Sequence, residues 1–201
     1  MLMKKIVITG ANGFIGRYAV NKLLEKGFEV HALGRQESFV RPEGAIHRSY
    51  QLLDPSADFD GLFEQIKPTH LLHLAWCVEP GKFWTDPDNI DWVNASLKLY
   101  RSFVNAGGKR VVMAGTCAEY DWSEKTVKDA LDEYRSPLKP ATLYGISKLA
   151  LFHKISEAAL RDGVSFGWGR IFFIYGPGEK RGRVISDTIY QLLQKQKIDL
   201  S

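Results

Sequence analysis

Short runs of β-branched and other apolar residues alternate along the chain with stretches in which apolar residues recur at helical spacing. The strand-like runs cover residues 6–8, 28–33, 45–49, 69–75, 110–114 and 165–174. Helical spacing covers residues 14–23, 59–66, 88–105, 144–161 and 184–193, and the first of these stretches would bury Phe14, Ile15, Tyr18, Ala19 and Leu23. This alternation predicts an α/β fold with a doubly wound parallel sheet, in which ligands bind beyond the carboxyl ends of the strands.

Composition and charge narrow the class of protein. The 201 residues, 45% hydrophobic and 25% charged, are enough for one compact domain with a core. The net charge of +4 is spread along the chain, so we expect no nucleic-acid partner. The first apolar run stops at Thr9, too early for a membrane span, so we expect no membrane partner. Cys77 and Cys117 lack the spacing of a zinc site and favour a reducing, cytoplasmic location.

A glycine-rich turn directly follows the first strand and opens the first helix. It has the spacing GxxGxxG. Glycines let the backbone approach a pyrophosphate closely, and the free N–H groups and dipole of the helix end attract its charge. The turn therefore predicts a dinucleotide site formed by Gly10, Asn12, Gly13, Phe14, Ile15 and Gly16.

The end of the second strand indicates which dinucleotide is bound. An NAD site usually places a carboxylate there, on the ribose 2′-hydroxyl, whereas this strand is followed by Arg35. A guanidinium suits a 2′-phosphate, so we expect NADP. Arg17 either assists or is a solvated helix residue, and Glu37 keeps NAD as the minority alternative.

A tyrosine and a lysine stand four residues apart, as Tyr144 and Lys148, on one face of a predicted helix. Spacing alone does not distinguish them from Tyr18 and Lys22. Position does, because their helix follows the fifth strand, whose carboxyl end carries the hydroxyl of Thr116.

Several motifs occur in a fixed order. They comprise residues 9–16, 73–75, Asn94, residues 114–120, 140–148 and 170–177. Together they resemble the extended short-chain dehydrogenases/reductases, the NAD-dependent epimerase/dehydratase family that acts mainly on nucleotide sugars. The resemblance implies an NAD(P)-binding Rossmann domain over residues 1–178. Residues 179–201 would then be the start of the substrate-binding lobe or a terminal helix, with most of the C-terminal lobe lacking.

The resemblance also implies roles for individual residues. Thr116, Tyr144 and Lys148 would be the catalytic trio, with Lys148 also holding the nicotinamide ribose. A phenol has a pKa of about 10, so Tyr144 could act as an acid or base near neutrality only if nearby cations lower that pKa. Asn94 would position the trio. Further cofactor contacts would come from Gln51, Leu52, Leu74, Ala75 and Trp76.

Departures from the family pattern limit the chemistry. The Asp-Glu pair that dehydratases carry after the threonine is Cys117-Ala118 here, so we expect no dehydration. Gln51 replaces the aspartate for adenine, and Phe173 replaces an asparagine that contacts the substrate diphosphate. The expected substrate contacts are Trp76, Cys117, Ala118, Phe173 and Arg183, with Arg181 and Arg183 as candidate phosphate ligands or solvated charges. A nucleophilic role for Cys117 is the minor interpretation.

Three functional hypotheses follow. The first is an NADP-dependent reductase acting on a keto group, at C4, of a nucleotide-activated deoxysugar. The second is an NAD-dependent nucleotide-sugar 4-epimerase, and the third is a dinucleotide-binding protein without turnover. By analogy, a homodimer would form through a four-helix bundle of residues 88–105 and 144–161. No metal is expected, because His70 and His73 point to opposite faces of a strand.

Overall fold

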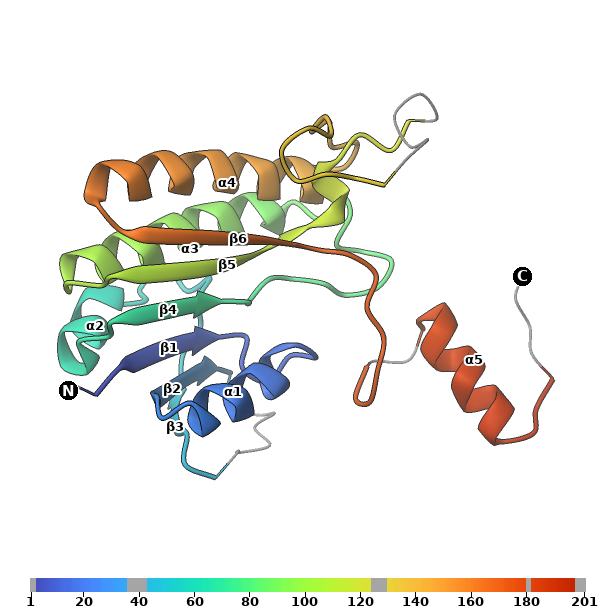
Figure 1. The fold of residues 1–201 in the computed structure, drawn as a ribbon, viewed down its shortest axis with the longest axis horizontal. Coiled ribbons are helices and arrows are strands. Elements are labelled where there is room, and N and C mark those ends of the chain that lie inside the picture. Colours follow the sequence, from blue (N-terminus) through green and yellow to red (C-terminus); the bar gives the residue numbers. More distant parts are fainter. Residues whose placement is uncertain (1–2, 36–42, 124–129, 180–181, 198–201) are drawn as a thin grey trace. The chain divides into compact units, whose positions relative to one another are not determined.

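The described residues form one sheet of six parallel strands (Figure 1). A computed structural model describes residues 3–35, 43–123, 130–179 and 182–197. The strands are β1 (Lys5–Thr9), β2 (Glu29–Gly34), β3 (Ile46–Ser49), β4 (His70–His73), β5 (Arg110–Thr116) and β6 (Ser165–Ile171). Their order is β3-β2-β1-β4-β5-β6, and every pair is parallel. The order reverses between β1 and β4, which confirms the predicted doubly wound, Rossmann-like sheet.

Helices connect the strands, and side chains next to them fix several helix ends. The helices are α1 (Gly16–Glu25), α2 (Phe59–Ile66), α3 (Asp88–Asn105), the short 3-10 helix η2 (Cys117–Glu119), α4 (Leu143–Asp162) and α5 (Val184–Leu193). The Asp58 carboxylate accepts the Gly61 N–H at the start of α2, and the Thr142 hydroxyl accepts the Gly145 N–H at the start of α4. Gly163, in the left-handed conformation, ends α4.

The two faces of the sheet carry different helices. One apolar cluster joins β1, β2, β4 and β5 to buried side chains of α2, α3 and α4, among them Phe63, Phe103 and Leu151. A smaller cluster on the other face joins β1 and β2 to α1 through Val20. Helix α1 therefore lies on the opposite face of the sheet from α2, α3 and α4, and its first turn follows the end of β1.

The structure differs from the sequence prediction at several element ends, among them β4, which was expected over 69–75 and spans His70–His73, and in the burial of one side chain. Tyr18 is exposed rather than buried, because the buried stripe of α1 runs through Gly16 and Val20. The last strand ends at Ile171 and not at residue 174, since Ile171 pairs with Thr116 and β5 offers no partner further on. Phe173 beyond it is 78% exposed.

The chain divides into two compact units, residues 1–171 and 172–201. The second contains α5, none of whose side chains is buried. Neither unit's described helices include one long and apolar enough to cross a membrane.

Candidate active site

The glycine turn is built so that two of its glycines cannot carry a side chain. Gly10 has a φ of +70°, and a Cβ on it would lie 2.8 Å from the amide nitrogen of Ala75. A Cβ on Gly16 would lie 2.1 Å from the carbonyl oxygen of Gly10. That same carbonyl accepts the N–H of Gly13 at 2.9 Å. The turn thus packs against the end of β4 and directs the first amides of α1 beyond the strand ends, a cradle that fits the pyrophosphate of a dinucleotide.

A buried polar chain links the ends of β1 and β4 to α3. The Ser96 hydroxyl donates to the carbonyl of Trp92 (2.6 Å), so it accepts from His73 Nε2 (2.8 Å). His73 Nδ1 then accepts from the Thr9 hydroxyl (2.7 Å), whose oxygen accepts the Ala75 N–H (3.2 Å). Burial lowers the pKa of His73 to about 3, with a further lowering by the Lys148 charge, so the ring is neutral.

From the sequence, Asn94 was expected to be the residue of this helix that positions the catalytic trio. The structure leaves Asn94 exposed on α3, and the residue that reaches the buried chain is Ser96. The expected positioning role of Asn94 is therefore wrong, and Ser96 makes the buried contact from this helix. In the sequence, Ser96 could have been noticed as a polar residue on the apolar face of the predicted helix.

Lys148 is buried at the carboxyl end of β5. Its side chain is 3% exposed, its Nζ donates to the Ala114 carbonyl at 2.8 Å, and the same nitrogen lies 3.8 Å from the ring centroid of Trp76. Burial lowers the pKa of Lys148 to about 7, against the opposing effect of the Glu119 charge. The ammonium thus lies between a carbonyl and an aromatic face, beside the end of the strand that carries Thr116.

Tyr144 lies one helical turn before Lys148 and is surrounded by aromatic rings. Its ring centroid is 5.0 Å from that of Phe83, 5.9 Å from that of Trp84 and 6.4 Å from that of Trp76, all at steep interplanar angles. Its backbone N–H donates to the Trp84 carbonyl at 3.1 Å. Trp76 therefore contacts both members of the predicted Tyr–Lys pair.

Trp76 is itself held in place by α3. Its indole N–H donates to Asn89 Oδ1 at 2.8 Å, and its ring stacks on that of Trp92 with centroids 5.8 Å apart. The Asn89 amide in turn donates to the carbonyls of Phe83 and Asp86. No role for Asn89 was predicted from the sequence, because its position in the first turn of a helix was its only distinctive feature.

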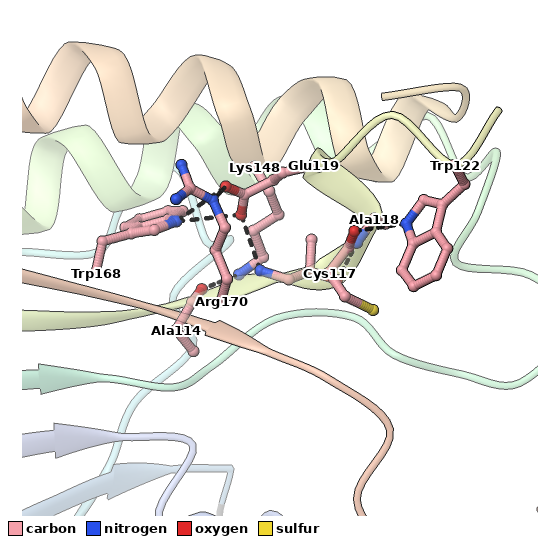
Figure 2. Close-up of polar contacts among 9 residues, drawn as sticks. Ala114, Cys117, Ala118, Glu119, Trp122, Lys148, Trp168 and Arg170 are labelled. Carbon is pink, nitrogen blue, oxygen red and sulfur yellow. Dashed lines mark hydrogen bonds and ion pairs between the residues drawn. The ribbon is translucent and has the colours of Figure 1, made fainter. Parts of the chain in front are cut away.

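Thr116 ends β5 and begins η2. Its hydroxyl accepts the N–H of Ala118 at 3.2 Å, and its own N–H donates to the Glu119 carboxylate at 2.8 Å, which together form a capping box. Cys117 in this turn is buried, and burial raises the pKa of its thiol, which disfavours the reactive thiolate. The carbonyl of Cys117 accepts the indole N–H of Trp122 (Figure 2).

A buried ion pair includes Glu119, the last residue of this turn (Figure 2). The fully buried carboxylate of Glu119 accepts from Arg170 Nε at 2.7 Å and from the indole N–H of Trp168 at 3.1 Å. Arg170 and Trp168 both belong to β6. Neither Glu119 nor Trp168 was identified from the sequence, because a glutamate after a strand reads as a surface residue.

The other predicted cofactor contacts lie after β2, β3 and β4 or on α1. Arg35 is exposed directly after β2, and Arg17 is exposed on α1. Gln51 and Leu52 follow β3, where Gln51 borders a hollow of about 430 Å³. Leu74 and Ala75 are half-buried after β4.

Some predicted contacts cannot be placed at the site. Phe173 and Arg183 belong to the second unit, residues 172–201. Glu37 and Arg181 lie outside the described residues. Among the described residues no group of three His, Cys, Asp or Glu side chains is arranged to hold a metal ion.

Comparison with known proteins identifies the family. Residues 6–201 match the model of the NAD dependent epimerase/dehydratase family. The chain is 30% identical over 176 residues to the dTDP-6-deoxy-L-talose 4-dehydrogenase (NAD(+)) of Aggregatibacter actinomycetemcomitans, covering 85% of this chain and 62% of the relative. It is 28% identical over 209 residues to the UDP-glucose 4-epimerase of Streptomyces lividans, covering 94% of this chain and 57% of the relative.

A solved structure gives the same result. The Bordetella bronchiseptica enzyme WbmG in complex with NAD superposes with a TM-score of 0.74 at 26% identity, over 98% of this chain and 61% of that one. The chain thus spans about 60% of the length of these relatives. Its fold, the glycine turn and the match over residues 6–201 establish that the chain belongs to the NAD dependent epimerase/dehydratase family.

Proposed function

We propose that this chain provides the dinucleotide site and the catalytic trio of an oxidoreductase that reduces a keto group, at C4, of a nucleotide-linked deoxysugar. The observation that carries the proposal is the position of Lys148, buried with its Nζ on the Ala114 carbonyl. This position puts a cation beside Tyr144 and next to the strand end that holds Thr116. Two of the relatives bear names that include chemistry at C4 of a nucleotide sugar.

In this proposal each side chain has one task. The bound dinucleotide supplies or accepts the hydride. The Tyr144 phenol gives its proton to the substrate oxygen during reduction, and the Lys148 charge makes the phenol a stronger acid. The Thr116 hydroxyl donates to the same oxygen and orients the carbonyl carbon. The aromatic rings of Phe83, Trp84 and Trp76 exclude water around the phenol.

For the cofactor we propose NADP, on the basis of Arg35. A guanidinium after β2 is placed to pair with a ribose 2′-phosphate. The family model and two of the three relatives carry NAD in their names or complexes, and this supports NAD as the alternative.

The second candidate function is a nucleotide-sugar 4-epimerase. It is favoured by the 28% identity to a UDP-glucose 4-epimerase. An epimerase oxidises and re-reduces one carbon, so it converts UDP-glucose without net consumption of cofactor. The appearance of UDP-galactose from UDP-glucose would favour this candidate over the reductase.

The experiment follows NADPH oxidation by the purified chain with a nucleotide-linked 4-keto-6-deoxysugar. We expect turnover that falls by about 100-fold or more in Tyr144→Phe, the usual size of a lost general acid. Tyr134→Phe is the matched control, because the Tyr134 side chain is 96% exposed and should leave the rate unchanged. Full turnover in Tyr144→Phe would refute the proposed acid. Binding of NADPH with no turnover of any keto-sugar would favour the non-catalytic hypothesis.

A further inference from the structure

Glu119 is a buried carboxylate that joins the turn after β5 to two side chains of β6. Its exposed fraction is 0%, and its oxygens accept from the Thr116 N–H, the Trp168 indole and Arg170 Nε. Position 115 has no room for a side chain, because a Cβ on Gly115 would lie 2.1 Å from the Trp168 nitrogen and 2.7 Å from the Glu119 carboxylate. The glycine between Ala114 and Thr116 thus allows the carboxylate to reach the backbone of the turn.

Arg170 is held as firmly as its partner. Its guanidinium carbon lies 5.3 Å from the ring centroid of Tyr120 and 5.0 Å from that of Phe152. The side chain of Arg170 in the ion pair is 9% exposed. Removing two charges from water is costly, and hydrophobic residues of similar volume usually serve stability equally well. The pair therefore calls for an explanation other than stability.

The neighbours of the pair supply that explanation. Thr116, fixed by Glu119 through its N–H, is two residues from Ala114, whose carbonyl holds the Lys148 ammonium (Figure 2). We propose that Glu119 is a positioning residue of the candidate active site: it fixes the backbone of Thr116 and places a negative charge at the strand end whose Ala114 carbonyl holds Lys148. This inference rests on the proposed function for its catalytic consequence.

The charged and titratable groups around Lys148 support this assignment. Helix α4 itself contributes the Tyr144 phenol, β4 contributes His73, and β6 contributes the Arg170 cation. His73 is neutral, and Arg170 is paired with Glu119. From η2 come Cys117, whose raised pKa keeps it neutral, and Glu119, which acts to raise the pKa of Lys148. Glu119 is thus the described carboxylate whose charge offsets the burial of the lysine.

The test is a titration of Lys148 followed by NMR of ¹³C-labelled lysine, with the signal assigned by its loss in Lys148→Met. In Glu119→Gln, which keeps an acceptor for the Thr116 N–H but loses the charge, Lys148 should titrate at lower pH than in the wild type. We expect about tenfold less protonated lysine at pH 8, the size typical of losing one neighbouring opposite charge. Glu157→Gln, on the exposed side of α4, is the control and should titrate as the wild type does.

A merely structural role for Glu119 gives the opposite result. Loosening the packing would admit water and raise the pKa of Lys148 toward that of a free lysine. An unchanged or raised titration in Glu119→Gln would therefore overturn the proposal. Should that variant not fold because Arg170 is left unpaired, Arg170→Met is compared with the double variant Glu119→Gln, Arg170→Met, and Lys148 must titrate at lower pH in the double variant.

Catalysis provides an independent readout. With the keto-sugar and NADPH, Glu119→Gln should shift the alkaline limb of the kcat/KM profile to lower pH and lower kcat without a matching change in KM. Should the wild type show no turnover, the proposed function fails while the lysine titration still decides the role of Glu119. If Glu119→Gln turns over substrate with an unshifted alkaline limb, the proposed role of Glu119 fails while the proposed function of the chain stands.

Discussion

Individual side chains determine what the candidate site can do, and their protonation depends on where they lie. His73 is the clearest example. Its ring links Thr9 to Ser96 at 2.7 and 2.8 Å and requires one donating and one accepting nitrogen. Protonation would turn both nitrogens into donors, so the Thr9 hydroxyl would lose the acceptor to which it now donates. The histidine is therefore a structural link between the glycine turn and α3, and no acid–base role is assigned to it.

We expect this link to fail in acid. The pKa of His73 is lowered from 6.5 to about 3, so the unfolded chain binds the proton first as the pH falls. Below about pH 6.5 the free energy of unfolding should thus decrease by up to ~1.4 kcal/mol per pH unit until about pH 3. Urea unfolding between pH 7 and 4 measures this. His73→Asn should flatten the dependence relative to His153→Asn, an exposed histidine on α4, and equal slopes would argue against the neutral ring.

Arg35 provides the residue-scale test of the cofactor. Its exposed guanidinium can pair with a 2′-phosphate, and a charge-assisted pair contributes about 1.5–3 kcal/mol. The wild type should therefore bind NADPH at least about tenfold more tightly than NADH, measured by calorimetric titration. In Arg35→Ala the two affinities should converge through weaker NADPH binding. A wild type that prefers NADH, with no effect of Arg35→Ala, would remove the argument for NADP.

At the scale of elements, the sequence predicted the helices and strands well where local chemistry decides them. Helix α3 was expected over 88–105 and occupies those residues, and α4 was extended by one residue at each end of the expected 144–161. The glycine turn was also predictable, because its spacing directly reflects the close approach of Gly10 and Gly16 to backbone atoms. These features depend on neighbours that are close along the chain.

Features that depend on distant neighbours were not predictable in the same way. The end of β6 is set by the length of its partner β5, and the exposure of Tyr18 by how α1 lies on β1 and β2. The ion pair of Glu119 with Arg170 joins residues 51 positions apart. Such a pair cannot be inferred from the periodicity of either segment, although Arg170 lay in a motif already noted.

At the scale of the whole molecule, the first compact unit contains the glycine turn and all three members of the predicted trio. Residues 1–171 form it, and the sheet order brings the ends of β1, β4 and β5 to neighbouring positions. The reversal of strand order between β1 and β4 is where doubly wound sheets bind their ligands. The dinucleotide and catalytic parts of the proposed function therefore reside in a single unit.

The most direct test of this account is a fluorescence titration of the purified chain with NADPH. Trp76 lies on Lys148, and bound reduced nicotinamide beside it should accept energy from the indole. We predict saturable loss of tryptophan emission with sensitised nicotinamide emission, and both should persist in the control Trp122→Phe. No saturable binding of either NADPH or NADH would contradict the central claim that a nicotinamide lies beside Tyr144 and Lys148.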